Sequence, residues 1–323
     1  MKCQDPKPLP KRQFLKTCLG ATMACVGPVD RGACQAVSET IPSPIVDLHQ
    51  HTLYSGRNDQ QLMQHQEAMG VDLTVLLPAG KYYGLAARCG SNETVHRLAS
   101  LYPDRFVFFA NEVPDLALAG ETIERYLKLG ACGIGEQKFE LNCDAQAIER
   151  IASMAADYQV PILMHFQHRA YNTSLERFHK VLEKYPRTHF IGHAQTWWGH
   201  IDRHHQPEVM YPTGPVTPGG LTDRLLSDYP NMHGDLSAGS GLNALQRDED
   251  HAREFLLRHQ DKLIFGSDCN DSFGKGPGCQ GGHTLRALRG LVEEDHVLKK
   301  LLCENARRLL KLKHHPALHS LSR

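Results

Sequence analysis

From Pro44 onward, short apolar segments alternate with segments whose apolar residues recur at helical spacing. The apolar segments are rich in β-branched and aromatic residues and predict strands at 45–49, 72–77, 106–110, 132–138, 161–166, 188–193, 232–236 and 262–267. Amphipathic patterns predict helices at 59–69, 92–102, 121–129, 144–158, 174–185, 221–229, 248–258 and 284–312. Strands that alternate with helices in this way indicate parallel strands joined by crossover helices.

Eight strand–helix units predict a (β/α)8 TIM barrel. The length of 323 residues agrees with this fold, which typically needs about 250 residues and often more. A doubly wound open sheet is the alternative, but the sequence has no glycine-rich phosphate fingerprint after the first strand. We therefore expect one catalytic barrel domain at residues 37–323.

Two connections in this barrel are long. Residues 194–220 follow the sixth strand and include Trp197, and the glycine-rich residues 269–283 follow the eighth. Both lie at the carboxyl ends of strands, where barrel enzymes place their active sites. We expect them to contribute to substrate recognition, with Trp197 as a candidate contact; tolerated surface insertions are the alternative.

Residues 1–36 have the layout of an export signal, with a basic stretch, a short apolar region at 17–29 and small residues at 33–36. The segment KRQFLK at 11–16 resembles a twin-arginine signal, with a lysine in place of the first arginine. We expect export to the periplasm or cell envelope. A disordered basic tail on a cytoplasmic protein is the alternative.

Charge narrows the range of partners. Residues 1–36 hold six of the 36 Lys and Arg and two of the 36 Asp and Glu, which leaves 30 basic and 34 acidic residues after signal removal. That balance disfavours nucleic acid as a partner, and no apolar run reaches the roughly 20 residues of a membrane span. We expect a small-molecule substrate and leave homo-oligomerisation open. Six scattered cysteines remain, of which Cys269 and Cys279 could pair in an oxidising compartment.

Metal-binding residue types stand at the ends of several predicted strands. His49 and His51 close the first strand two residues apart, so their side chains point to the same side and can chelate one cation. His165, His193 and Asp268 close the fifth, sixth and eighth strands. Because a closed barrel brings these ends together, the sequence predicts a metal site there.

These motifs carry a family resemblance. DLHQH at 47–51, PILMH at 161–165, IGH at 191–193, LIFGSD at 263–268 and NARRL at 305–309 resemble the amidohydrolase-related family that includes the aminocarboxymuconate-semialdehyde decarboxylase type. The resemblance covers about residues 44–312. It implies that His49, His51, His165 and Asp268 bind a divalent metal, usually Zn2+, and that His193 acts on the substrate or holds a second ion.

The fourth strand bears on the number of metal ions. GIGEQK at 133–138 is similar to the strand of TatD-like and phosphotriesterase-like relatives, in which a glutamate or a carboxylated lysine bridges two metals. Glu136 and Lys138 are two residues apart, so both can face the barrel interior. A bridging Glu136 implies two ions, with His193 as a ligand of the second. A Glu136–Lys138 salt bridge implies one.

The expected activity is hydrolysis of an amide, lactone or ester bond in a small molecule. A bound divalent ion lowers the pKa of its water to about 7, Asp268 would take the proton, and His193 would polarise the substrate. A lyase that decarboxylates or hydrates its substrate is the alternative, in which Arg169 or Arg57 would hold a carboxylate. Lys138 is a further candidate substrate contact, and Asp47 a candidate to orient a ligand. A binding module without catalysis is disfavoured by the complete ligand set.

Overall fold

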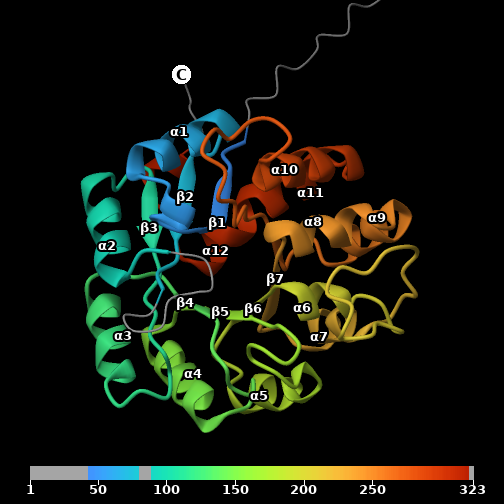
Figure 1. The fold of residues 1–323 in the computed structure, drawn as a ribbon, viewed down its shortest axis with the longest axis horizontal. Coiled ribbons are helices and arrows are strands. Elements are labelled where there is room, and N and C mark those ends of the chain that lie inside the picture. Colours follow the sequence, from blue (N-terminus) through green and yellow to red (C-terminus); the bar gives the residue numbers. More distant parts are fainter. Residues whose placement is uncertain (1–42, 80–88, 320–323) are drawn as a thin grey trace, which may run out of the picture. The chain divides into compact units, whose positions relative to one another are not determined.

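The computed structural model describes residues 43–79 and 89–319. The predicted export signal lies outside these residues. Eight parallel strands follow one another along the chain and surround a common axis, with helices outside them (Figure 1). The strands are β1 (Val46–Gln50), β2 (Leu73–Leu76), β3 (Phe106–Phe108), β4 (Ile134–Gln137), β5 (Ile162–His165), β6 (Phe190–His193), β7 (Met232–Asp235) and β8 (Leu263–Ile264). All eight predicted strands are confirmed, and the fold is the expected (β/α)8 barrel.

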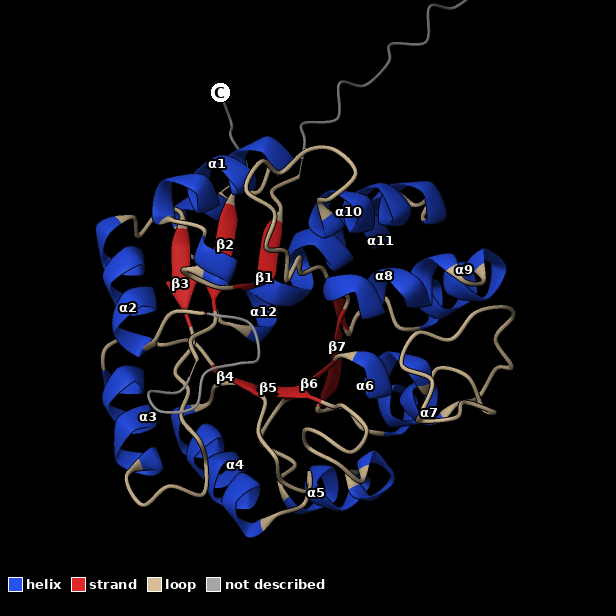
Figure 2. Cartoon of the chain, in the orientation of Figure 1, coloured by secondary structure: helices blue, strands red, loops and turns tan. Residues whose placement is uncertain are grey.

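The helices occupy the outer layer (Figure 2). They are α1 (Asp59–Met69), α2 (Asn92–Leu101), α3 (Ala119–Lys128), α4 (Gln146–Tyr158), α5 (His179–Lys184), α6 (Gln195–Gly199), α7 (Leu221–Asp228), α8 (Ala238–Gln246), α9 (Glu249–Arg258), α10 (Gln280–Leu291), α11 (Asp295–Lys299) and α12 (Asn305–Leu309). Among residues 43–79 and 89–319, no helix is long and apolar enough to cross a membrane.

The strands form two sheets, one in the order β1-β2-β3 and one in the order β4-β5-β6-β7-β8. Backbone hydrogen bonds join the sheets at both seams. Ala110 donates to Gly133 at 2.9 Å beside β3 and β4, and Leu48 donates to Phe265 at 3.1 Å beside β1 and β8. These bonds close the ring, so the carboxyl ends of all eight strands meet around one axis.

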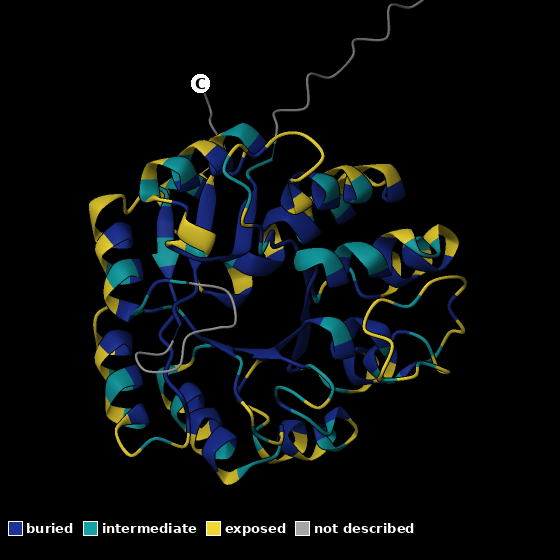
Figure 3. Ribbon diagram, in the orientation of Figure 1, coloured by how far each residue is buried: buried dark blue, intermediate teal, exposed yellow. Residues whose placement is uncertain are grey.

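Packing explains why the strand patterns predict the fold so well. Every residue of β1, β2, β4, β5, β6, β7 and β8 is buried, because one face lines the barrel interior and the other packs under the helices (Figure 3). Strands buried on both faces give near-continuous apolar runs. Polar residues within such runs therefore stand out as candidates for function.

The structure differs from the sequence-based prediction in the second half of the chain. Helix α8 was not predicted, because AGSGLNALQ has glycine and serine in its first turn and lacks a clear apolar period. The single helix predicted at 284–312 begins earlier, at Gln280, and is interrupted after Leu291, where Val292 adopts an extended conformation. A turn of π-helix, Lys300–Glu304, then joins α11 to α12.

The predicted insertion at 194–220 contains helix α6, which carries Trp197 into the core. The Trp197 ring has no exposed surface and stacks on Phe166 at a centroid distance of 6.1 Å. Gly192 on β6 makes room for it, because a Cβ there would lie 2.4 Å from the indole. The expectation that Trp197 contacts the substrate is therefore not supported: its side chain offers no surface to one.

Replacing Trp197 with alanine is expected to destabilise the barrel without acting on substrate directly. Loss of a buried tryptophan costs about 3–5 kcal/mol of unfolding free energy. Chemical denaturation of Trp197→Ala checks this, with the exposed Phe273→Ala as the control that should change by less than about 0.5 kcal/mol. Equal stability of the two variants would contradict the placement of Trp197 in the core.

Candidate metal centre

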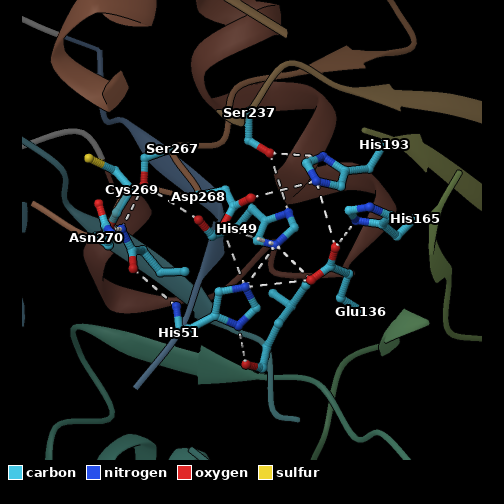
Figure 4. Close-up of polar contacts among 12 residues, drawn as sticks. His49, His51, Glu136, His165, His193, Ser237, Ser267, Asp268, Cys269 and Asn270 are labelled. Atoms are coloured by element: carbon cyan, nitrogen blue, oxygen red, sulfur yellow. Dashed lines mark hydrogen bonds and ion pairs between the residues drawn. The ribbon is translucent and has the colours of Figure 1, made fainter. Parts of the chain in front are cut away.

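Six side chains named from the sequence converge at the carboxyl ends of the strands (Figure 4). They come from β1, β4, β5 and β6, from the residue directly after β1 and from the segment that follows β8, and they are His49, His51, Glu136, His165, His193 and Asp268. Strands β5 and β6 run in register, with His165 opposite His193. The alignment of strand ends therefore places these side chains at one level of the barrel.

One set of donor atoms gathers around His49 and His51. Their Nε2 atoms lie 3.2 Å apart, and Glu136 Oε2 lies 3.7 Å from the first and 3.6 Å from the second. Asp268 Oδ1 completes the set, at 3.9 Å from His49 Nε2 and 3.5 Å from His51 Nε2.

The other oxygens of the same two carboxylates face the remaining histidines. Glu136 Oε1 lies 3.7 Å from His193 Nε2 and forms a short contact with His165 Nδ1. Asp268 Oδ2 lies 3.6 Å from His193 Nε2. Each carboxylate thus presents one oxygen to the His49–His51 pair and the other toward His193.

The spacing of the first set fits a divalent metal. Metal–nitrogen bonds of about 2.0–2.1 Å and metal–oxygen bonds of about 2.0–2.2 Å put neighbouring donors of a tetrahedral ion about 3.3–3.6 Å apart. The observed separations of 3.2–3.9 Å bracket that value. In addition, Asp268 Oδ1 is buried and accepts no hydrogen bond from the described residues. A cation between these atoms would satisfy it.

Hydrogen bonds at the far side of the rings determine which nitrogens face the centre. His49 Nδ1 lies 2.7 Å from Asp235 Oδ2, and His51 Nδ1 lies 2.8 Å from the Leu77 carbonyl oxygen. An oxygen of this kind accepts the Nδ1 proton, so in the neutral rings both Nε2 lone pairs point inward, 3.2 Å apart. Two lone pairs at this distance repel each other unless a cation lies between them.

Asp235 orients His193 as well as His49. His193 Nδ1 lies 3.0 Å from Asp235 Oδ2 and 3.1 Å from the Ser237 hydroxyl, which itself donates to Asp235 at 2.7 Å. Gly266 permits this close packing, because a Cβ there would lie 2.5 Å from Asp235 Oδ1. A carboxylate behind a ligating imidazole fixes its tautomer and raises its basicity.

The pKa values of the buried groups indicate that the carboxylates of the centre favour positive charge beside them. Burial raises the pKa of the Asp268 carboxyl, but His49 and His51 outweigh it and lower the pKa to about 2. Burial likewise opposes ionisation of His51, whereas Cys89 and Asp268 beside it raise its pKa to about 10. The pKa of His165 falls to about 4 because it is buried, which keeps this ring neutral. Without a metal, the carboxylates favour protons on His49 and His51; a cation can replace those protons.

A separate network ties β1 to the residues that carry Asp268. Asp47 accepts from the Ser267 backbone at 2.8 Å, from the Ser267 hydroxyl at 2.5 Å and from Gln66 at 2.9 Å. Arg57 is buried and donates to the carbonyls of Cys269 and Asp271 at 2.9 and 2.8 Å. The Asp47 side chain therefore holds the segment that carries Asp268 and does not orient an imidazole. The Arg57 guanidinium donates to backbone carbonyls of the same segment.

Comparison with known proteins agrees with this geometry. The sequence matches the amidohydrolase family over residues 46–312. The chain belongs to the amidohydrolase family. No curated protein shows significant similarity to it.

Solved structures with the same barrel include several members of the amidohydrolase superfamily. An amidohydrolase from Burkholderia multivorans is 12% identical, with a TM-score of 0.59 over 83% of this chain and 99% of that one. The 2,6-dihydroxybenzoate decarboxylase from Rhizobium is 15% identical, with a TM-score of 0.58 over 84% and 100%. A manganese-bound 5-carboxyvanillate decarboxylase from Novosphingobium aromaticivorans is 15% identical, with a TM-score of 0.50 over 78% and 80%. At these identities the likeness shows the fold.

The other predicted substrate contacts of this amidohydrolase-family chain lie farther out. Lys138 lines a cavity together with Tyr171, and its Nζ lies 5.5 Å from the centroid of the Tyr171 ring. Arg169 is exposed and lies 3.6 Å from Glu208, outside the histidine cluster. Cys269 and Cys279 are both buried free thiols.

Sequence reasoning missed Asp235, Ser237 and Tyr54. Asp235 ends β7 at the same level as the other site residues, so its position after an apolar strand was a usable signal. Ser237 and Tyr54 lie in connecting segments without a distinctive pattern. The Tyr54 ring packs edge-on against His51 at 5.0 Å, and the charge of Asp268 raises the pKa of its phenol, which stays protonated at neutral pH.

Asparagine at position 235 is expected to weaken metal binding about 10- to 100-fold, because the amide cannot stabilise the ligating forms of His49 and His193 as the carboxylate does. Competition with a chelator of known affinity measures this. Asp223→Asn is the matched control: Asp223 accepts from His259 Nε2 at 2.6 Å in a pair that is separate from the centre. Equal affinities for the two variants would refute the orienting role of Asp235.

Proposed function

We propose that this chain is a metal-dependent hydrolase that holds two divalent ions, one at His49 and His51 and the other at His165 and His193, with Glu136 and Asp268 shared between them. The division of each carboxylate between two sets of nitrogens supports this assignment. A single ion needs only one of the two sets. When bound, such ions lower the pKa of a water to about 7 and polarise the bond to be broken.

Zn2+ is the proposed metal, because imidazole nitrogens and carboxylate oxygens are its common ligands in proteins. Manganese fits the same donors, and it is bound in the decarboxylase neighbour from Novosphingobium aromaticivorans.

Within this centre Asp268 is the proposed proton acceptor. Its lowered pKa keeps it ionised at neutral pH, and each carboxylate oxygen has a second lone pair besides the one that would face an ion. It can take a proton from the attacking water and deliver it to the leaving group. The protonated Tyr54 phenol beside it is placed to donate a hydrogen bond to an oxygen that gains charge.

The substrate is proposed to be a small anionic molecule. A cavity of about 470 Å³ is lined by Lys138 and Tyr171, by the carboxylates Asp115 and Glu140, and by apolar residues. Tyr171 links it to the metal ligands, because its ring meets the His165 ring at 5.6 Å. The volume suits a small ligand, and the Lys138 ammonium can pair with a carboxylate at the end remote from the scissile bond.

Decarboxylation is the second candidate. Two of the neighbouring structures are decarboxylases of aromatic acids, although their similarity to this chain extends to the fold alone. The same centre could then hold the carboxylate that leaves as CO2. The two reactions differ in their products and are separable by experiment.

Elemental analysis of protein purified without chelator should find at least two ions per chain. His193→Ala and Glu136→Ala should each hold at least one ion fewer than the wild type, since each removes donors of the second ion. His259→Ala serves as the control, because this buried histidine pairs with Asp223 away from the centre. A wild type with a single ion that survives both site substitutions would overturn the two-ion assignment.

A substrate panel should distinguish the two reactions. We expect the Zn2+-loaded protein to cleave esters, lactones or amides that carry a remote carboxylate, with kcat/KM at least about tenfold above that for neutral analogues, a factor equivalent to roughly 1.4 kcal/mol. Lys138→Met should remove that preference mainly through KM.

The lyase alternative is tested by measuring, in parallel, the CO2 that the protein releases from aromatic carboxylic acids. CO2 release with no hydrolysis of any member of the panel would establish the lyase. Lys184→Met is the matched control, because Lys184 is an exposed lysine that pairs with Glu149 on the surface.

A further inference from the structure

Four side chains with nitrogen or sulfur donors meet where the loop from β8 to α10 packs against α1. They lie outside the histidine–carboxylate centre, the name used here for the six converging residues described above. His65 and Met69 lie four residues apart on one face of α1. Cys269 follows β8, and Cys279 caps the amino end of α10. The Cys269 sulfur is directed away from His49 and His193 (Figure 4). We call these four residues the thiol cluster.

The cluster is compact and dry. Cys279 Sγ lies 3.6 Å from His65 Nε2 and 3.7 Å from Met69 Sδ. One donor atom each of His65, Cys269 and Cys279 lies within 4.8 Å of the other two. His65 and Cys279 have no exposed surface, and Cys269 has 1%.

These separations match the edges of a tetrahedral metal site. Metal–sulfur bonds of about 2.3 Å and metal–nitrogen bonds of about 2.0–2.1 Å place two sulfurs about 3.8 Å apart and a sulfur and a nitrogen about 3.5 Å apart. The two measured edges, 3.7 and 3.6 Å, lie within about 0.1 Å of those values.

The surrounding backbone holds the donors in place. The Gly282 N–H donates to Cys279 Sγ at 3.3 Å, a contact that stabilises a thiolate. Gly281 allows Met69 to approach, because a Cβ there would lie 2.8 Å from its sulfur. The Cys269 carbonyl accepts from Gln50 and Arg57, both at 2.9 Å. The position of Cys269 is therefore set by the same network that holds Asp268.

We propose that the thiol cluster is a second metal site, which takes one thiophilic d10 cation, Zn2+ or Cu+, through His65, Cys269 and Cys279, with the Met69 thioether as the fourth donor. Thiolate and thioether ligands select such ions over the hard cations that oxygen ligands prefer. Two thiolates neutralise a divalent ion, so the buried site carries little net charge. Each thiol releases its proton to solvent on binding.

A metal in the thiol cluster would stabilise the loop next to the histidine–carboxylate centre. Cys269 is covalently adjacent to Asp268, so an ion that joins Cys269 to α1 and α10 restrains the Asp268 backbone. The proposal does not depend on the hydrolytic function, because sulfur ligation has its own spectroscopic signature.

Cobalt substitution tests the proposal directly. Metal-free full-length protein, reduced with a phosphine, is titrated with Co2+ while absorbance is recorded. Wild type should develop a thiolate-to-cobalt charge-transfer band whose final intensity corresponds to one thiolate-bound cobalt ion per chain, whatever further Co2+ the histidine–carboxylate centre takes up. Cys279→Ser and Cys269→Ser should each lose at least about 90% of the band. Zn2+ or Cu+ added afterwards should bleach it.

Two control variants keep the test decisive. Cys89 lies beside His51 and could supply sulfur to the main centre, so Cys89→Ser must retain the band; Cys143→Ser, a buried thiol elsewhere, must retain it too. No band in wild type, or a band lost in Cys89→Ser and kept in Cys279→Ser, would overturn the proposal. If the serine variants fail to fold by circular dichroism, wild type and Cys89→Ser still decide it.

Discussion

The Asp235 carboxylate holds two imidazoles at once, and the geometry of the centre depends on it. One oxygen accepts hydrogen bonds from both His49 and His193 at their Nδ1 atoms, at 2.7 and 3.0 Å. This leaves both Nε2 atoms facing the shared carboxylates. The backbone carbonyl of Asp235 in turn accepts from the buried Trp198 indole at 2.9 Å, which anchors the end of β7 to α6. A core contact thus supports the orientation of two candidate metal ligands, His49 and His193, on other strands.

The barrel gathers acidic groups where burial makes charge costly. Asp47, Glu136, Asp235 and Asp268 lie together at the strand ends, three of them with 2% exposure or less. The cost of burying the Asp47 carboxylate is offset by hydrogen bonds from Ser267 and Gln66. The cost of burying the Asp235 carboxylate is offset by His49 and His193. Glu136 and Asp268 face the four imidazoles of His49, His51, His165 and His193. A divalent cation between them would balance this charge, and it would also give the buried Asp268 Oδ1 a partner.

The strands could be predicted because most contain short apolar runs, such as LTVL in β2, and several end in a polar residue, such as ILMH in β5 and FIGH in β6. The same signal identified the six converging side chains, since the carboxyl ends of barrel strands meet on one rim. Asp235 has this signal too and was overlooked, whereas Ser237 and Tyr54 act from connecting segments without a periodic pattern. Trp197 was misjudged for a related reason: a tryptophan in a long connection looks exposed in sequence, yet α6 turns it onto Phe166. Helix α8, with its glycine and serine first turn, is stabilised by packing that sequence does not reveal.

The thiol cluster could not be foreseen as a site, because its members come from α1, from the end of β8 and from α10. Only the cysteine pair was visible in sequence, as a candidate disulfide. The fold adds His65 and Met69 by laying α1 against the loop, and these change the chemistry from a thiol pair to a set of four soft donors.

The number and spacing of the metals test the central claim most directly. Diffraction from crystals of the Zn2+-loaded protein, measured on both sides of the zinc absorption edge, locates each ion by its anomalous signal. The account predicts two peaks at the histidine–carboxylate centre, about 3.5–4 Å apart, with Glu136 and Asp268 between them. A single peak on His49 and His51, with Glu136 bonded only to His165, would contradict it.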